Sequence, residues 1–168
     1  MKYALIVSAI ISLPLSAQEG VIQNSFGQEF LKHWTAARDL TLSVAQAMPP
    51  ENYDFKPNPE EMSFGEQMIH IAGGNYVYCS RISGAKSPFA KPDKPDQATA
   101  VSMLKQSFEY CANAIDAAKD LNAMRGPEGK QMSLREVMLG AYAHMAHHRG
   151  QAEVYLRLKG IKPPAYNF

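Results

Sequence analysis

The sequence lacks an excess of charge of either sign, which limits the partners that it attracts. Its 168 residues include 17 lysines and arginines against 16 aspartates and glutamates, a formal net charge of +1. Proteins that bind nucleic acid or anionic membranes through electrostatics carry a clear basic surplus. We therefore expect neither of these partners, and a small-molecule substrate or ligand is the more natural one.

A hydrophobic run long enough to cross a bilayer is also missing. A membrane-spanning helix needs about 20 apolar residues, whereas the apolar run near the N-terminus covers only residues 3–13. Lys2 precedes this run and small residues ending at Ala17 follow it, an order typical of a secretory signal peptide. We therefore expect residues 1–17 to be cleaved and residues 18–168 to form one domain. The mature protein would be periplasmic or extracellular, with no stable membrane span.

Cysteine is scarce, and its spacing excludes one class of site. The chain has two cysteines, Cys79 and Cys111, and they do not form the C-x-x-C pattern of redox and zinc motifs. In an oxidising compartment the two can form a disulfide. Buried free thiols that behave as small apolar side chains explain them equally well. The sequence leaves this choice open.

Four amphipathic helices are predicted, and no convincing strand is found. The spacing of apolar residues and the helix start and stop signals give their bounds. The first runs from about Asn24 to Met48, the second from the capping box Ser63–Glu66 to Gly84, the third from near Asp96, and the fourth from the capping box Ser133–Glu136 to Gly160.

The loops between these helices indicate how the helices are connected. Residues 49–61 and 84–96 are rich in proline and lack an apolar period, so they are expected to be loops. Four long amphipathic helices favour an all-α four-helix bundle. The segment 84–96 is long enough to cross the whole bundle. We therefore expect an up-down-down-up topology with a long crossover between the second and third helices.

Histidines are concentrated in the fourth helix, where His144, His147 and His148 occupy five positions. His144 and His148 are four residues apart, so they lie one turn apart on nearly the same face. His70 lies on the second helix, and facing helices of a bundle approach to about 8–10 Å. Three neutral imidazoles plus water are typical of an open zinc site, and nickel and iron are alternatives. A solvated helix face is the competing interpretation.

Two features beside His70 have alternative interpretations. Glu66 lies one turn before His70 and can act as a base there, although its place in a capping box explains it without catalysis. Gly73 and Gly74 interrupt the helix interior, where each glycine costs about 1 kcal/mol relative to alanine. They provide either close packing against the first helix or room for a substrate near His70.

Three segments of the chain resemble the DinB-like superfamily, whose members are metal-binding four-helix bundles. These segments are residues 53–59 (YDFKPNP), residues 62–70 (MSFGEQMIH), and residues 144–151 (HMAHHRGQ) with the following 155–164 (YLRLKGIKPP). The resemblance covers residues 26 to 164. It implies that His70, His144 and His148 are the metal ligands and that His147 is not.

The resemblance leaves the reaction open, because relatives include thiol-dependent transferases, isomerases and hydrolases. Low-molecular-weight thiols are chiefly cytosolic, whereas hydrolysis needs only water. For an exported protein we therefore favour a metal-dependent hydrolase holding one divalent ion, most simply zinc. The alternatives are a thiol-dependent transferase, a non-catalytic module that binds a metal or small ligand, and a bundle without metal. The sequence leaves a homodimer open.

Overall fold

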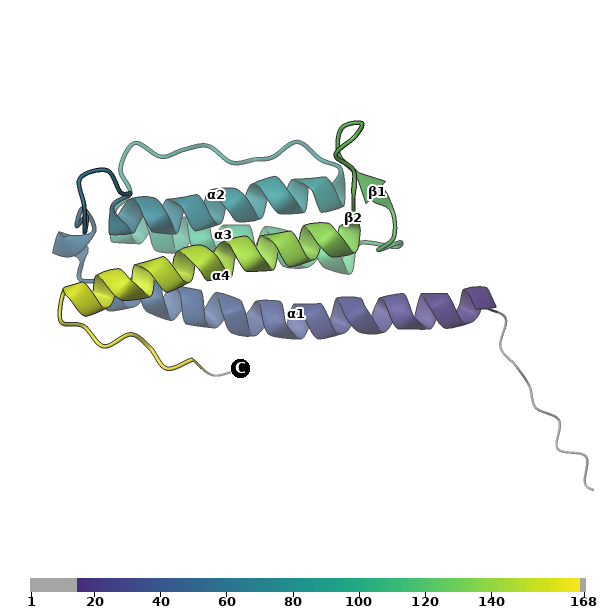
Figure 1. The fold of residues 1–168 in the computed structure, drawn as a ribbon, viewed down its shortest axis with the longest axis horizontal. Coiled ribbons are helices and arrows are strands. Elements are labelled where there is room, and N and C mark those ends of the chain that lie inside the picture. The colour runs from purple at the N-terminus through teal and green to yellow at the C-terminus, as the bar shows by residue number, and fades with distance from the viewer. Residues whose placement is uncertain (1–14, 167–168) are drawn as a thin grey trace, which may run out of the picture.

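The computed structural model describes residues 15–166, which form four long helices and three short elements. In chain order these are α1 (Leu15–Ala47), the 3-10 helix η1 (Pro50–Asn52), α2 (Phe64–Ser83), α3 (Gln97–Asp116), β1 (Met124–Arg125), β2 (Met132–Ser133) and α4 (Leu134–Leu158). The long helices lie side by side along one common direction (Figure 1). None of the described helices is both long and apolar enough to cross a bilayer.

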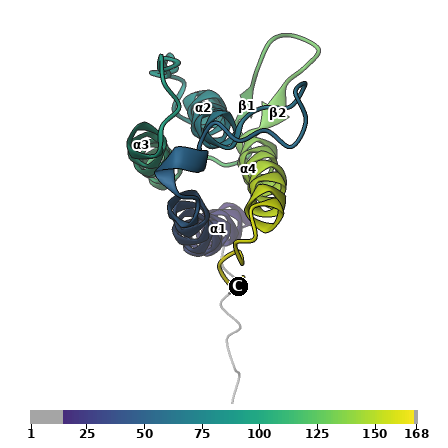
Figure 2. The same ribbon diagram turned by 90° about the vertical axis from the view of Figure 1, so that its left-hand side faces the viewer.

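The helices follow the predicted up-down-down-up order. Helices α1 and α4 run in one direction and α2 and α3 in the other, because residues 84–96 return along the length of the bundle before α3 begins (Figure 1). Viewed from the end, α2 lies between α3 and α4, and α1 completes the bundle on the opposite side (Figure 2). The all-α four-helix bundle expected from the sequence is therefore confirmed.

Local hydrogen bonds fix the starts of α2, α3 and α4. The Ser63 hydroxyl accepts the Glu66 backbone N–H at 3.2 Å, and the Glu66 carboxylate accepts the Ser63 N–H at 2.7 Å. Ser133 and Glu136 form the same capping box at α4. The Asp96 carboxylate accepts the Thr99 N–H at 2.8 Å and caps α3. Each cap satisfies backbone donors that the first helical turn would otherwise leave unpaired.

The structure departs from the sequence predictions at three places. Helix α1 begins at Leu15 rather than near Asn24, because no proline interrupts residues 15–24. The expectation of no strand was wrong, since β1 and β2 pair with Met124 opposite Ser133. Two-residue strands are too short to show a period in the sequence. The segment 49–61 also contains the single turn η1.

The predicted signal peptide falls largely outside the structure. Residues 1–14 lie outside the described residues, and residues 15–17 form the start of α1. Cleavage after Ala17 therefore stays a prediction.

Aromatic packing centres the core on Trp34 of α1, which is 1% exposed. Its ring centroid lies 4.9 Å from that of Phe108 on α3, and its Nε1–H donates to the Phe108 carbonyl oxygen at 3.2 Å. The hydroxyl of Thr41, also on α1, reaches the sulfur of Met145 on α4 at 3.4 Å. These contacts join α1 to both of its neighbours.

A disulfide between Cys79 and Cys111 joins α2 to α3. Their Cα atoms are 5.1 Å apart, and both side chains are fully buried. The structure thus selects the disulfide over the two free thiols. The bond links the two helices that the long crossover separates along the chain.

Reduction of this disulfide should destabilise the protein. The bond closes a loop with a sequence separation of 32 residues, and the loop-entropy estimate for that length is about 3–4 kcal/mol. Urea unfolding with and without reductant should therefore show a large drop in the midpoint. The double variant Cys79→Ala/Cys111→Ala should have the same midpoint in both buffers. Equal midpoints for the wild type would contradict the assignment.

Candidate metal centre

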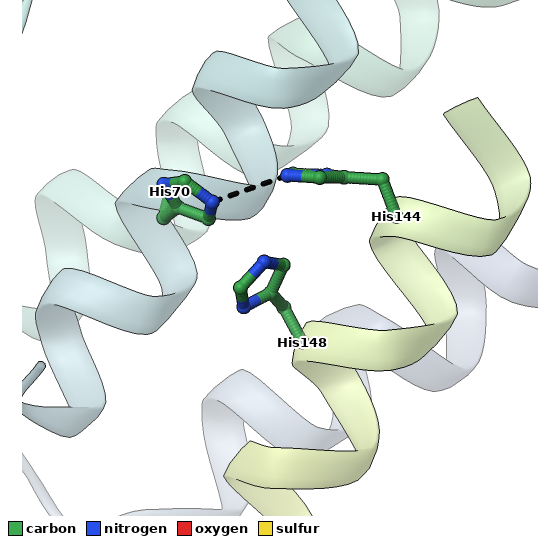
Figure 3. Close-up of side chains that lie close together, drawn as sticks. All are labelled: His70, His144 and His148. Atoms are coloured by element: carbon green, nitrogen blue, oxygen red, sulfur yellow. Dashed lines mark hydrogen bonds between the residues drawn. The ribbon is translucent and has the colours of Figure 1, made fainter. Parts of the chain in front are cut away.

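Three histidines from two helices converge at the interface of α2 and α4. His70 extends from α2, and His144 and His148 extend toward it from successive turns of α4 (Figure 3). One ring nitrogen from each of the three lies within 4.8 Å of the others. The ring centroids are 4.3 to 4.9 Å apart. The sequence prediction selected these three residues, and the structure brings them together.

A chain of hydrogen bonds fixes the orientation of His148. The Tyr155 hydroxyl donates to the Met62 carbonyl at 3.0 Å, so the Tyr155 oxygen can accept from the Gln67 amide nitrogen, 3.5 Å away. The same amide nitrogen donates to Gln151 Oε1 at 3.2 Å. The Gln67 carbonyl oxygen therefore faces His148 Nδ1, 2.9 Å away. This acceptor requires the proton on Nδ1 and leaves the Nε2 lone pair free.

Packing positions the His144 ring, beside its hydrogen bond to His70. A Cβ atom added at Gly74 of α2 would overlap the His144 ring, so only glycine leaves space for it. Gly140 of α4 accommodates Tyr78 of α2 in the same way, with a built Cβ only 3.0 Å from the Tyr78 ring. The Tyr78 and His144 ring centroids are 5.7 Å apart. Among the described residues, no group hydrogen-bonds the buried Nδ1 of His144.

The glycine pair in α2 serves neither of the two purposes expected from the sequence. Gly74 admits a histidine of α4, not a substrate, and it does not pack against the first helix. Gly73 faces Phe89 of the crossover, whose ring lies 3.0 Å from a built Cβ. The two glycines therefore let α4 and the crossover approach α2 from different sides.

His70 is the exposed member of the cluster. Its Nε2 lies 3.1 Å from Nε2 of His144, so one of these two nitrogens carries a hydrogen and donates a hydrogen bond to the other (Figure 3). His70 also lines a cavity of about 330 Å³ between α2 and the crossover. Its other lining residues are Met62, Glu66, Ile69, Phe89, Lys91, Pro92, Asp93 and Pro95. A small molecule in this cavity would reach the cluster from the His70 side.

Electrostatics favour the neutral form of two imidazoles of the cluster, those of His144 and His148. Burial lowers the pKa of His148 to about 4, and repulsion from a charged His70 lowers it as well. Burial and the same repulsion lower the pKa of His144. Both rings are therefore uncharged at neutral pH, which is the form that offers a lone pair to a metal ion.

Two other candidates near the cluster, His147 and Glu66, lie outside it. His147 is exposed and makes an edge contact with His148 at a centroid distance of 4.9 Å, and it lies outside the three-residue cluster. The Glu66 carboxylate accepts the Ser63 N–H, which holds its pKa below the usual range, and lies 3.4 Å from Lys56. The capping interpretation of Glu66 therefore holds.

Sequence reasoning missed Gln67 as the residue that orients His148. Gln67 is 1% exposed, although an amide side chain is seldom fully buried without partners. Its spacing of three residues before His70 places it on the side of α2 that turns toward α4. The signal available in the sequence was a polar residue one helical turn before a candidate ligand, on the same side of the helix.

Comparisons with known proteins identify a family and agree with the fold. The model of the DinB family matches residues 22–168. The chain is 23% identical over 142 residues to the protein YjoA of Bacillus subtilis (strain 168), covering 79% of this chain and 90% of that protein. It is similar to the crystal structure of YjoA, a DinB-like protein, with a TM-score of 0.69 over 83% of this chain and 97% of that one. A DinB-like protein from Bacillus cereus ATCC 10987, 21% identical, has a TM-score of 0.70 with the same coverage.

Replacement of Gly74 by alanine should damage the cluster. Overpacking against His144 is expected to lower the free energy of unfolding of the metal-free protein by about 1–3 kcal/mol. Gly27→Ala is the matched control, since its added Cβ would meet Leu121 at an ordinary 3.8 Å. The control should gain up to about 1 kcal/mol from helix propensity. Urea titrations measure the free energy of unfolding of both variants. An equal gain in this free energy for the two variants would refute the role given to Gly74.

Proposed function

The chain belongs to the DinB family, and we propose that it is an exported protein that binds one divalent metal ion and hydrolyses a small-molecule substrate. The ligands would be His70, His144 and His148. The convergence of one nitrogen from each of these side chains within 4.8 Å carries the proposal.

The donor set fits a borderline metal such as zinc. Imidazole nitrogens suit zinc, nickel and iron, and three histidine ligands are a known arrangement in catalytic zinc sites. When bound, such an ion supplies Lewis-acid activation of water or of a substrate carbonyl. Because histidine binds a metal ion as a neutral imidazole, three histidine ligands would leave the positive charge of the ion uncompensated.

The protein contributes the position of each ligand. The Gln67 carbonyl oxygen accepts a hydrogen bond from Nδ1–H of His148. This hydrogen bond directs the Nε2 lone pair of His148 into the cluster. Removal of a residue that hydrogen-bonds a metal ligand in this way typically lowers the metal affinity by 10- to 100-fold. Gly74 and Tyr78 hold His144 by contact. His70 remains exposed, so its side of the cluster is the entry for substrate.

The cavity beside His70 supports a small organic substrate. Its volume of about 330 Å³ falls at the lower end of the range for ligand pockets. Apolar walls from Met62, Ile69 and Phe89 would contact the body of the substrate. Lys91 and Asp93 of the crossover offer one positive and one negative group at the same cavity.

Export supports hydrolysis over thiol transfer. Structural disulfides persist in oxidising compartments outside the cytosol, and Cys79 and Cys111 form one here. Low-molecular-weight thiols are chiefly cytosolic, whereas water is available everywhere. The disulfide thus adds support to the signal-peptide prediction, and both favour a reaction that uses water.

A non-catalytic binding module is the second candidate. Among the described residues, the cluster contains histidines and no carboxylate, and the nearby Glu66 is held by Ser63 and Lys56. The three-histidine cluster itself therefore offers no carboxylate as a general base. Hydrolysis would then depend on activation of water by the ion itself.

Metal analysis tests the binding step. The purified protein should contain about one equivalent of divalent metal by inductively coupled plasma mass spectrometry. His70→Ala, His144→Ala and His148→Ala should each lose it, whereas His147→Ala on the same helix should retain it. A chelator should lower the melting temperature of the wild type, because an ion bound only by the folded state stabilises it. Wild type that takes up no metal on reconstitution would refute the proposal.

A substrate screen tests the reaction. Metal-loaded wild type should hydrolyse one or more small esters or amides, and His144→Ala should not. Turnover that requires an added thiol acceptor would identify a transferase instead. If the metal-loaded protein turns over none of these classes of substrate, the protein is the non-catalytic binding module.

A further inference from the structure

The outward face of α4 is apolar over most of its length. Its exposed residues between Glu136 and Arg157 carry no fixed charge. Arg157 is exposed as well, and its guanidinium lies 4.0 Å from the carboxylate of Glu153 on the same helix. We call these residues the α4 outer face: Leu139, Ala143, His147, Gly150, Val154 and Leu158. Leu139, Val154 and Leu158 are 56%, 50% and 59% exposed, and they are three of the six large apolar side chains that the described residues expose.

Helices α1 and α3 show that such a face is not general in this bundle. From Ser25 onward, the exposed residues of α1 are all polar: Ser25, Gln28, Glu29, Lys32, Thr35, Asp39, Ser43 and Gln46. On α3 they are polar with one exception: Ala98, Ser102, Lys105, Gln106, Glu109, Asn113 and Asp116. Contiguous exposed apolar surface marks an interaction site. Among the exposed faces of α1, α3 and α4, the α4 outer face is therefore the one suited to bind another protein.

The α4 outer face is symmetric about its own midpoint. Counted from the peptide bond between His148 and Arg149, Val154 is as far in one direction as Ala143 is in the other. The same relation holds for Gly150 with His147 and for Leu158 with Leu139. If a second α4 packs in the reverse direction, a large residue meets a small one in the two central pairs. A Cβ at Gly150 would meet no atom within 4 Å, so this position is open to a partner.

The charges at the two ends of the face also match in reverse orientation. Glu136 lies at the start of α4, and Lys159 and Lys162 follow its end, all three exposed. An antiparallel pair brings Glu136 of one copy close to these lysines of the other. A parallel pair would bring like charges together at both ends, which costs energy. The helix dipoles favour the antiparallel arrangement as well.

We propose that a second copy of this chain docks on the α4 outer face, as an antiparallel helix pair related by a two-fold axis. A two-fold interface requires a self-complementary surface, and this face has that property in size and in charge. The interface would border the metal centre, because the ring of His147 contacts that of His148 at a centroid distance of 4.9 Å. The inference does not depend on whether a metal is bound.

Sedimentation equilibrium on the full-length chain tests the dimer. Val154→Glu should raise the dissociation constant by about 100-fold or more, because it places an unpaired charge in the interface. Val77→Glu is the matched control, since Val77 is 44% exposed on α2 and lies off the face. The control should keep the wild-type constant, and circular dichroism should show that both variants are folded. Wild type at monomer mass throughout the concentration series, or an unchanged Val154→Glu dimer, would overturn the proposal.

Cross-linking tests the orientation. Ala143→Cys and Val154→Cys chains, mixed and oxidised, should form a disulfide between the two different variants. Neither variant should cross-link to itself, because equivalent residues would lie about 16 Å apart along the antiparallel helices at 1.5 Å per residue. The native cysteines do not interfere, since Cys79 and Cys111 are joined and buried. Self-linked species alone would indicate a parallel pair, and no linked species would indicate no pair; either result overturns the proposal.

Discussion

Close packing of α2 against α4 is the constraint on which the histidine cluster depends. Each helix carries a glycine opposite an aromatic ring of the other: Gly74 faces His144, and Gly140 faces Tyr78. The hydrogen bond from His148 to Gln67 adds a polar contact one turn further along. Steric contact thus places one imidazole and hydrogen bonding places the other. A small displacement of either helix would move His70 away from both.

The topology places α2 between α3 and α4, so α2 links the histidine cluster to α3. Because the crossover returns along the bundle, α2 lies next to both α3 and α4 (Figure 2). Cys79 of α2 is bonded to α3, while His70 and Gln67 are directed toward α4. The buried disulfide therefore restrains the helix that presents the exposed ligand. The crossover that creates this arrangement also lines the cavity beside His70.

Features set by local contacts were predictable from the sequence, and the family resemblance supplied the meeting of His70 with the α4 histidines, whereas the contacts that depend on the exact register between two helices were not predicted. The capping boxes at Ser63 and Ser133 depend on residues three apart, so the sequence pattern is sufficient. The His144–His148 pair likewise follows from helical spacing. The role of Gly74 and the pairing of Cys79 with Cys111 depend on the register between neighbouring helices. Helical periodicity does not contain that register, and no spacing within one helix predicts it.

The most direct test of the central claim is an anomalous-diffraction experiment on crystals of the metal-loaded protein, recorded at the absorption edge of the bound metal. The three-histidine arrangement predicts a single strong peak among the ring nitrogens of His70, His144 and His148. It also predicts that Gln67 remains hydrogen-bonded to Nδ1 of His148. A peak at another place in the bundle, or bound metal without these three ligands, would contradict the account.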